Sequence, residues 1–433
     1  MMQYFHSVRL DQERCLGCTN CIKRCPTEAI RVREGKATII EERCIDCGEC
    51  IRICPNNAKT AYSDSLSFWR PDDYNIALPA PSFFGQFKPN ITPEQVVSAF
   101  RAIGFDDVYE VARAADYLTC VMRLFLKENR GTTWISSSCP AIVRLIQVRF
   151  PELLPQLLPL ETPMELAAQL AKQRARLQHH KQTIKAFFIT PCPAKTTAVH
   201  QPEGNPTHVD GTLSISEVYT ALMKALPQSN EGNRLRASRH GLRWALSGGE
   251  IMALGETNTL AVDGVHDVVS MLEELELGRL EGVDFIEAQA CPGGCLGGPL
   301  TVTNHFVSHA RLKALTQKLT KDRITDCSHV ASMVRIPHSI SPRPILPLDN
   351  DVTTAIRRME RLELLLDGLP GLDCGACGAP NCRALAEDIV RGLANETDCI
   401  IKLRERVKKL AEEMVDLSTK LPPAMGRGGV PND

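Results

Sequence analysis

Cysteine is the residue type whose spacing in this sequence most directly indicates chemistry. Sixteen of the eighteen cysteines in the 433 residues fall into four sets of four. Three sets are local runs, namely Cys15, Cys18, Cys21, Cys25; Cys44, Cys47, Cys50, Cys54; and Cys374, Cys377, Cys382, Cys399. The fourth set is scattered: Cys139, Cys192, Cys291, Cys295. Repeated C-x-x-C spacing without a leader segment indicates metal sites rather than disulfides. A scattered set must be gathered by a folded domain, which predicts a site that does chemistry.

The composition narrows the class of protein. A chain of 433 residues is long enough for two to four domains. The net charge of −1 and the 23% of charged residues give no sign of a nucleic-acid-binding surface. No apolar stretch approaches the roughly 18 to 20 residues that span a bilayer. The chain enters its first cysteine run without a signal-peptide pattern. We therefore expect a reducing cytoplasm, no membrane span and no nucleic-acid partner.

The two N-terminal runs both read C-x2-C-x2-C-x3-C-P, and this pattern resembles that of two-cluster bacterial ferredoxins. In that pattern the fourth cysteine of each run ligates the other 4Fe–4S cluster. The predicted ligand sets are Cys15, Cys18, Cys21, Cys54 for cluster one and Cys44, Cys47, Cys50, Cys25 for cluster two. Residues 27–29 and 56–58 extend the repeat beyond the cysteines. The alternatives are a zinc-binding module or a purely structural cluster, and two complete runs favour electron carriers.

The middle of the chain alternates short apolar runs with amphipathic segments. We expect strands at 75–80, 107–112, 133–137, 185–190 and 284–288, and helices at 92–103, 114–128 and from Pro140. Thr92, Pro93 and Gln95 form a predicted capping box. Cys139, Cys192 and Cys291 each follow a predicted strand. Ligands of doubly wound sheets collect where strands end, so the pattern predicts one shared site.

Three segments give this region a specific resemblance. They are Ser136-Ser-Ser-Cys139-Pro140, Thr190-Pro-Cys192-Pro-Ala-Lys195, and Glu287-Ala-Gln-Ala-Cys291-Pro-Gly-Gly-Cys295. Their order and content resemble the catalytic domain of the FeFe hydrogenases. The resemblance implies an H-cluster, in which Cys139, Cys192, Cys291 and Cys295 hold a 4Fe–4S cubane. Cys295 would also bridge to a two-iron subsite that carries carbonyl, cyanide and a dithiolate. It implies interconversion of protons, electrons and H2.

The same resemblance marks four other residues as parts of the active site. Lys195 and Ser82, the latter following Pro81, match positions that donate hydrogen bonds to the two cyanides. Ser138 stands where catalytic members carry a cysteine that relays protons to the open iron. A serine hydroxyl is far less acidic than a thiol, whose pKa is about 8.5, so relay through Ser138 should be slow.

Other departures also separate this chain from fast hydrogenases. Catalytic members carry glutamates in the helix before the first segment, whereas this chain has none between Val111 and Lys127. Thr190 and Gln289 replace methionines, and the glycine run after Cys295 ends early at Pro299. These departures resemble the sensory branch of the family, in which a slow hydrogenase reports to a signalling partner. They also resemble cluster-assembly homologues that keep the fold and the cubane without the two-iron subsite.

The C-terminal part carries the last cysteine set. Residues 331–348 contain four prolines and predict an extended linker, followed by a helix over 349–366. Cys374, Cys377, Cys382 and Cys399 resemble the small 4Fe–4S domain of redox-complex subunits and corrinoid proteins; zinc is the alternative. A 3-4 apolar repeat from Ile400 to Leu421 predicts an amphipathic helix. That helix either docks on its own domain or forms a coiled-coil dimer. Residues 422–433 should be disordered.

Several other residues gave no functional signal. Cys120 and Cys327 have no partner at ligand spacing, and we assign them to packing or to the surface. The adjacent His179 and His180 belong to a basic, solvated stretch. Ser247-Gly248-Gly249-Glu250 is too short for a phosphate loop, so we assign it a backbone-packing role.

These observations predict an α/β catalytic domain of two lobes with parallel sheets. An N-terminal α+β ferredoxin-like domain and a small, mainly helical C-terminal 4Fe–4S domain should flank it. The predicted boundaries are 1–70, 71–330, 331–348 for the linker, 349–400, 401–421 for the last helix and 422–433 for the tail. The expected partners are a redox protein such as a ferredoxin, H2 and protons, a signalling protein, and a second copy through the last helix.

Overall fold

The computed structural model describes residues 4–66, 72–178, 183–226, 234–256, 258–321, 323–337, 340–343, 348–349 and 351–420. The chain forms two compact units. Unit 1 comprises residues 1–15, 24–29 and 40–345, and unit 2 comprises 16–23, 30–39 and 346–433. The predicted domains divide the chain differently, because the first 70 residues contribute to both units. Outside the described residues lie the predicted tail over 422–433, His179 with His180, and two of the four linker prolines, Pro344 and Pro347.

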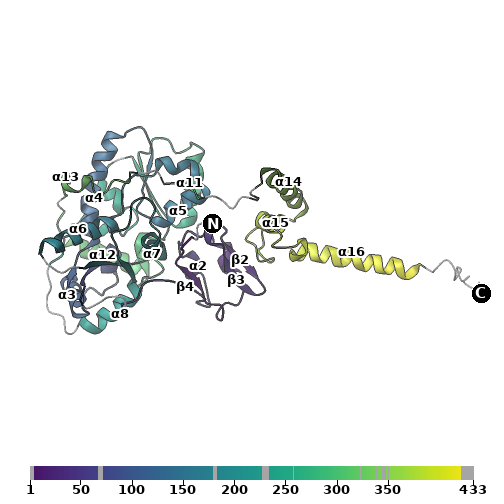
Figure 1. Cartoon of the computed structure of the whole chain (residues 1–433), viewed down its shortest axis with the longest axis horizontal. Helices are drawn as coiled ribbons and strands as arrows, with labels where there is room; N and C mark the ends of the chain where they lie inside the picture. Colours follow the sequence, from purple (N-terminus) through teal and green to yellow (C-terminus); the bar gives the residue numbers. More distant parts are fainter. Residues whose placement is uncertain are drawn as a thin grey trace, which may run out of the picture. The chain divides into compact units, whose positions relative to one another are not determined.

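A four-stranded parallel sheet in the order β6-β5-β8-β9 forms one lobe of unit 1 (Figure 1). Every residue of β5 is buried, as expected for a central strand of a parallel sheet that is covered on both faces. Its strands are β5 (Tyr74–Pro79), β6 (Asp107–Val108), β8 (Ile184–Thr190) and β9 (Gly211–Ser214). The helices of this lobe are η3 (Pro81–Gly85), α3 (Pro93–Ala102), α4 (Val111–Glu128), α6 (Pro163–Gln178), α7 (Pro193–His200), α8 (Ile215–Ala225), α9 (Arg239–Arg243), α12 (His305–Gln317) and α13 (Ser328–Ala331).

A three-stranded parallel sheet in the order β10-β11-β7 forms the second lobe. Its strands are β7 (Trp134–Ile135), β10 (Thr259–Asp263) and β11 (Phe285–Gln289), and its helices are α5 (Pro140–Arg149), η4 (Pro151–Gln156), α10 (Gly249–Leu254), α11 (Val265–Glu276) and η6 (Gly294–Gly297). A core of aliphatic side chains from α5, α11 and β11 fills this lobe, and Ile45 and Cys47 from the N-terminal region join it. The predicted α/β class with parallel sheets is confirmed.

Most predicted strands and helices of the middle region exist near their predicted bounds. The Thr92 capping box is present with both of its hydrogen bonds. The strand predicted over 107–112 is wrong beyond Val108, because α4 begins at Val111 and Glu110 is its N-cap. Glu110 accepts hydrogen bonds from the backbone of Arg236 and Ala237, and these contacts turn the chain out of the sheet.

The N-terminal elements repeat one another in structure as in sequence. In unit 1, β1 (Val8–Leu10) pairs antiparallel with β4 (Lys59–Ala61), next to η1 (Glu41–Arg43) and α2 (Glu49–Arg52). The Ala29 backbone N–H donates to the Cys25 sulfur and the Ala58 N–H to the Cys54 sulfur, both at 3.2 Å. The two fourth cysteines therefore have matching backbone donors, which supports the duplication inferred from residues 27–29 and 56–58.

Unit 2 contains one hairpin and mainly helical elements. The hairpin joins β2 (Ile30–Arg33) to β3 (Lys36–Ile39). The helices are α1 (Asn20–Lys23), α14 (Val352–Gly368), α15 (Cys382–Val390), η7 (Glu396–Asp398) and α16 (Ile400–Thr419). No residue of α16 is buried, and Leu403, Val407, Met414 and Leu417 are exposed. For the described residues of α16, docking on its own domain is therefore wrong, and the coiled coil stays a prediction.

Part of the predicted linker is attached to unit 1. Arg343 is buried, and its guanidinium pairs with Glu203 at 3.0 Å. The Arg343 backbone N–H donates to the Gln147 carbonyl at 3.2 Å, and that of Ile336 donates to the Pro159 carbonyl at 3.1 Å. These contacts fix the described residues of 334–343 against α5, the segment before α6 and Glu203.

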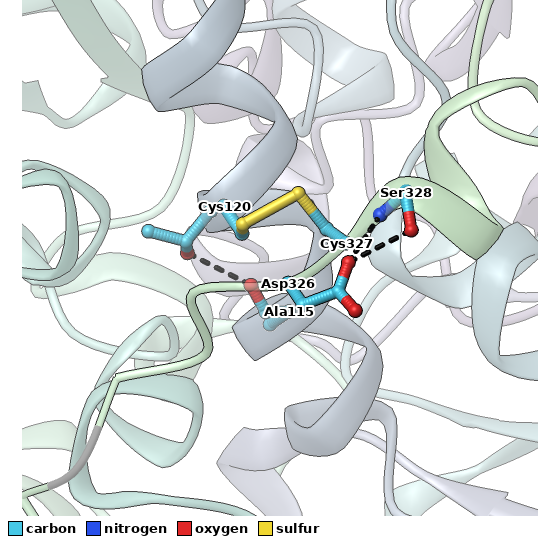
Figure 2. Close-up of a disulfide and its surroundings, with 6 residues drawn as sticks. Ala115, Cys120, Asp326, Cys327 and Ser328 are labelled. Carbon is cyan, nitrogen blue, oxygen red and sulfur yellow. Dashed lines mark hydrogen bonds between the residues drawn. A yellow bond between two sulfur atoms is a disulfide. The ribbon is translucent and has the colours of Figure 1, made fainter.

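Cys120 and Cys327 form a disulfide, which corrects their assignment as unpaired residues (Figure 2). Cys120 lies on α4 and Cys327 precedes α13, and their Cα atoms are 6.1 Å apart. Both side chains are buried, so the packing part of the assignment stands. A sequence separation of 207 residues hides the pair from any argument based on spacing. Stable disulfides are rare in reducing compartments, so this bond does not favour the predicted reducing cytoplasm.

None of the helices that the structure describes combines the length and apolarity needed to cross a bilayer.

Candidate functional site: a four-cysteine centre and its cavity

The four scattered cysteines come together where three parallel strands end. Cys139 follows β7 and caps α5, and Cys192 follows β8 and caps α7. Cys291 follows β11, and Cys295 lies in η6. The Cys295 sulfur interacts electrostatically with the sulfurs of the other three. Strand ends at the carboxyl edge of each sheet therefore place four thiols around one point, as the sequence pattern predicted.

The protonation behaviour of these thiols fits a metal centre. Burial raises the pKa of Cys192 and of Cys295 to about 12, against the opposing charge of Lys195. Burial likewise raises the pKa of Cys291. Thiols with raised pKa values are poor nucleophiles on their own, but a bound metal would take them as thiolates. The donor set of four sulfurs suits a 4Fe–4S cubane.

Lys195 is the cation nearest to this group of sulfurs. It is half-buried, and its Nζ donates to the Ser138 carbonyl at 3.1 Å. Burial acts against its charge, but the sulfurs of Cys295, Cys192 and Cys139 outweigh burial and raise the pKa of Lys195. The ammonium therefore stays charged beside the cysteines. A half-buried cation of this kind needs anionic or strongly polar partners.

A cavity opens beside Cys139, Cys295 and Lys195. It is lined by Ala80, Pro81, Ser82, Val111, Ala115, Ser138, Thr162, Pro163, Met164, Phe188, Pro191, Trp244, Ala245, Glu250, Ala288 and Gln289. Most of these side chains are apolar. The Ser82 hydroxyl and the side-chain amide oxygen (Oε1) of Gln289 are buried and have no hydrogen-bond partner within the described chain. Buried polar atoms are rarely left unpaired, so this cavity fits a bound group with polar ligands at its edge.

Glu250 is a polar residue of this cavity whose role the sequence did not reveal. Its carboxylate is buried and accepts hydrogen bonds from the Ser136 hydroxyl at 2.9 Å to both oxygens. The Ser138 backbone N–H in turn donates to the Ser136 hydroxyl at 3.2 Å. Burial, reinforced by the charge of Glu287, raises the pKa of Glu250 well above its ordinary value. A carboxyl group at the cavity can give a proton when it is protonated and accept one when it is ionised.

Glu287 extends this polar chain away from the cavity. It lies on β11, next to the third cysteine segment, and accepts hydrogen bonds from the backbone N–H groups of Gly248 and Ile251, both at 3.0 Å. Burial raises its pKa to about 7. The segment from Ser247 to Glu250, assigned to backbone packing, thus also carries a titratable side chain into the site. The sequence signal that could have revealed this role is the acidic residue of that segment, Glu250.

Comparison with known proteins decides the family. Residues 73–253 and 249–299 match the family described as iron only hydrogenase large subunit, C-terminal domain. The chain belongs to the iron-only hydrogenase family. Residues 7–55 match a 4Fe-4S dicluster domain, and residues 369–401 match a family described as a putative Fe-S cluster. These matches support iron–sulfur clusters in the N-terminal, middle and C-terminal regions.

Individual relatives are distant. The periplasmic [Fe] hydrogenase large subunit of Nitratidesulfovibrio vulgaris is 25% identical over 363 residues, which are 68% of this chain and 86% of that protein. Two solved structures of [FeFe]-hydrogenase HydA1 variants from Chlamydomonas reinhardtii, one of them apo, are each 14% identical with a TM-score of 0.47. Each covers 65% of this chain and 97% of the matched chain.

In this member of the iron-only hydrogenase family, the second N-terminal run lies close to the four-cysteine centre. The sulfurs of Cys44 and Cys47 both interact electrostatically with Cys25 and Cys50, which places Cys25 among the second run as predicted for cluster two. Cys15 and Cys54 belong to unit 1, whereas Cys18 and Cys21 belong to unit 2. The ligand set of cluster one therefore stays a prediction.

Arg52 joins the second run to the hydrogenase cysteines. Its guanidinium donates to the Cys291 sulfur at 3.6 Å and to the Gly297 carbonyl at 3.1 Å, and Glu49 pairs with it at 2.8 Å. Burial acts against the Arg52 charge, but Cys291 and Glu49 outweigh it and raise the pKa of Arg52. A fixed positive charge between Cys47 and Cys291 stabilises added negative charge on either side. Sequence spacing gave no sign of this residue.

The C-terminal cysteines gather around the small core of unit 2. Cys377, Cys382 and Cys399 pack against the aliphatic side chains of α14 and α15, and Cys374 interacts electrostatically with Cys377. The Cys382 backbone N–H donates to the Asp373 carboxylate at 2.7 Å, which fixes the start of α15. These positions fit the predicted four-cysteine centre.

Proposed function

We propose that this protein is a hydrogenase that interconverts 2 H⁺ + 2 e⁻ and H2 at an H-cluster. The observation that carries the proposal is a group of four cysteine sulfurs beside one cavity that a half-buried, charged lysine and an unpaired serine hydroxyl also line. When bound, the two-iron subsite would supply the open metal position at which H2 is split or formed. The protein's own residues would hold that subsite and manage protons.

The roles of the holding residues follow from their positions. Cys139, Cys192, Cys291 and Cys295 would hold the cubane, and Cys295, which lines the cavity, would also bridge to the subsite. Lys195 and the Ser82 hydroxyl, positioned after Pro81, would donate to its polar ligands. Ser82 has a donor free for this task, because the described chain offers its oxygen no partner. Apolar neighbours such as Phe188, Met164 and Trp244 would keep bulk water out.

Glu250 and Ser138 would manage the proton at the cavity. Ser138 lines the cavity, and Glu250 lies within hydrogen-bonding reach of the serines at 136 and 138. A proton could be held on the Glu250 carboxyl and passed through these hydroxyls to the cavity. Glu287, which is buried beside Glu250 and has a pKa of about 7, could receive it.

Electrons would move through the other cysteine sets. The proposed ligands are Cys15, Cys18, Cys21, Cys54 for cluster one, Cys44, Cys47, Cys50, Cys25 for cluster two and Cys374, Cys377, Cys382, Cys399 for the C-terminal cluster. The external partner would be a redox protein such as a ferredoxin.

We propose further that turnover is slow and serves a sensory or regulatory role. The support is chemical: a serine at 138, and no glutamate along α4 between Val111 and Lys127. The acid of that stretch, Asp116, accepts hydrogen bonds from the Ser238 backbone and hydroxyl. A signalling protein would then read the state of the clusters, and α16 could supply a homodimer contact. Cytoplasm remains the predicted compartment; the periplasmic description belongs to the Nitratidesulfovibrio vulgaris relative.

The competing function is a non-catalytic iron–sulfur scaffold or electron relay without the two-iron subsite. The same departures at Ser138 and in α4 favour it. The unpaired Ser82 hydroxyl and the charged Lys195 favour the hydrogenase, because both can donate hydrogen bonds to polar ligands of a two-iron subsite. A scaffold without that subsite would supply no such ligands.

Replacing Ser138 by Cys should raise H2 evolution roughly tenfold, because a thiol exchanges protons near neutral pH and a hydroxyl does not. The measurement is H2 formation from a reduced dye by protein loaded with a synthetic diiron precursor. Ser137→Cys is the matched control, since Ser137 donates to the Leu160 carbonyl and does not line the cavity. An unchanged rate in Ser138→Cys would show that the missing thiol does not limit turnover.

A further inference from the structure

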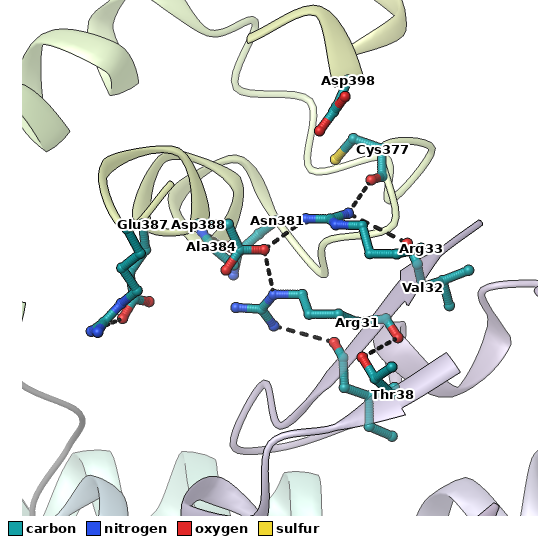
Figure 3. A network of polar contacts seen from close by, with 12 residues as sticks. Arg31, Val32, Arg33, Thr38, Cys377, Asn381, Ala384, Glu387, Asp388 and Asp398 are labelled. Atoms are coloured by element: carbon teal, nitrogen blue, oxygen red, sulfur yellow. Dashed lines mark hydrogen bonds and ion pairs between the residues drawn. The ribbon is translucent and has the colours of Figure 1, made fainter. Parts of the chain in front are cut away.

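The β2–β3 hairpin and the C-terminal cysteine region share a buried ionic contact inside unit 2 (Figure 3). Arg31 Nε lies 2.8 Å from the Asp388 Oδ2 atom, and Arg33 Nη2 lies 2.7 Å from the same atom. Asp388 belongs to α15, which begins at Cys382. One carboxylate therefore binds two guanidinium groups from a segment more than 350 residues away in sequence.

The burial of these charges indicates a built contact rather than a chance surface pair. The Arg31 and Asp388 side chains are 7% and 6% exposed. Buried charges are costly unless they are paired and hydrogen-bonded, and this group satisfies both conditions. The Arg31 guanidinium also donates to the Ile30 carbonyl at 3.2 Å.

Backbone contacts also connect the hairpin to the C-terminal cysteine region next to Asp388. The Val32 N–H donates to the Gly378 carbonyl at 2.8 Å. Gly378 has a φ of +77°, and a Cβ atom there would lie 1.8 Å from the Val32 carbonyl oxygen. Only glycine allows the hairpin to approach this closely.

The contact between the hairpin and α15 extends to the C-terminal cysteines and to α1 of the N-terminal region. Arg33 donates to the Cys377 carbonyl at 2.5 Å. The Arg33 guanidinium therefore places a positive charge against the backbone of the Cys374–Cys377 loop. At Gly375, a Cβ atom would lie 3.2 Å from Lys23 Cε and 3.4 Å from Ile22 Cδ1. The Cys374–Cys377 loop therefore lies against α1, which contains Cys21.

We propose that the β2–β3 hairpin is the docking surface of the C-terminal cysteine region and that Asp388 fixes this contact. The contact would serve electron exchange between the C-terminal centre and the first N-terminal run. One electron would leave the centre on one side and enter the centre on the other, with no proton moved and no bond broken. The C-terminal centre would then be part of the electron path of unit 2, held at a fixed contact. The proposal rests on the proposed iron–sulfur ligands and is independent of the two-iron subsite.

The test uses the full chain with its iron–sulfur clusters reconstituted and no diiron precursor. Asp388→Asn leaves the buried Arg31 and the half-buried Arg33 guanidinium groups without their counter-charge, so we expect hydrogen exchange at the Val32 amide to accelerate on the order of 100-fold. In the electron paramagnetic resonance spectrum of the dithionite-reduced protein, we expect the coupling signature between neighbouring clusters to weaken. Glu387→Gln is the matched control, because Glu387 pairs along the same helix with Arg391 at 2.9 Å and should leave both readouts unchanged.

A second variant keeps the test decisive if Asp388→Asn loses its C-terminal cluster. Arg33→Met leaves the Arg31–Asp388 pair in place but removes the charge at Cys377. We expect the C-terminal cluster to become harder to reduce in a spectroscopic redox titration while the hairpin stays protected. Unchanged Val32 exchange and unchanged cluster coupling in Asp388→Asn, or an unchanged C-terminal potential in Arg33→Met, would overturn the proposal. Neither result would bear on H2 chemistry, so failure here is distinct from failure of the hydrogenase proposal.

Discussion

Replacing Glu250 by Gln is expected to lower the rate of H2 evolution on the order of 100-fold, as is typical when a general acid or base is removed. Burial and the charge of Glu287 raise the pKa of Glu250, so its carboxyl group holds a proton to higher pH than an exposed glutamate does. The amide of Gln fills the same volume and can still accept from Ser136, but it cannot exchange a proton. The rate should be measured with protein loaded with a diiron precursor, at saturating reductant and over a range of pH.

The pH profile separates a proton role from a structural one. An acid with a raised pKa loses its proton as the pH rises through that pKa, so the wild-type rate should fall on the alkaline side. The Gln variant should lose that limb of the profile. Glu165→Gln is the matched control, since Glu165 is also buried with a raised pKa but accepts from Thr207 and the His208 backbone, away from this cavity. A Glu250→Gln protein with wild-type rate and profile would contradict the proposed relay.

Replacing Lys195 by Met is expected to have a comparable or larger effect, with activity falling roughly 100- to 1,000-fold. The half-buried ammonium lies near the cysteine sulfurs, which raise its pKa, so its loss removes the main positive group that could hold polar ligands of the two-iron subsite. Retention of the diiron group after loading and desalting should fall together with the activity, and iron analysis measures that retention.

Lys185→Met provides the control for this change. Lys185 lies on the same strand, β8, and pairs with Asp73 at 3.1 Å at the end away from the cysteines. We expect it to load and turn over as the wild type does. Full loading and full activity in Lys195→Met would show that this lysine does not hold the subsite.

The sequence predicted the parts of the site that depend on local order. Cys139, Cys192 and Cys291 follow parallel strands whose apolar runs are visible in sequence, and parallel strands bring their carboxyl ends to one edge. The Thr92 capping box was visible because its partners are three residues apart. The same holds for the matching hydrogen bonds to Cys25 and Cys54, which follow from a repeated segment.

Contacts between distant segments could not be predicted in this way. Glu250 faces Ser136 across 114 residues, and Arg52 reaches Cys291 across 239. Cys120 pairs with Cys327, although each is isolated in its own stretch. Asp388 gains its two arginines only because the hairpin folds against α15. Such pairs have no spacing to recognise, and their energy depends on burial that only the folded chain defines.

The central claim is that this cavity holds a two-iron subsite, and infrared spectroscopy of the loaded protein tests it most directly. Bound carbonyl and cyanide absorb in a region where protein does not. After incubation with a synthetic diiron precursor and desalting, the wild-type protein should show these bands, and Cys295→Ala should not. Absence of the bands in the wild-type protein, with its iron–sulfur clusters intact, would contradict the hydrogenase and favour the non-catalytic iron–sulfur protein.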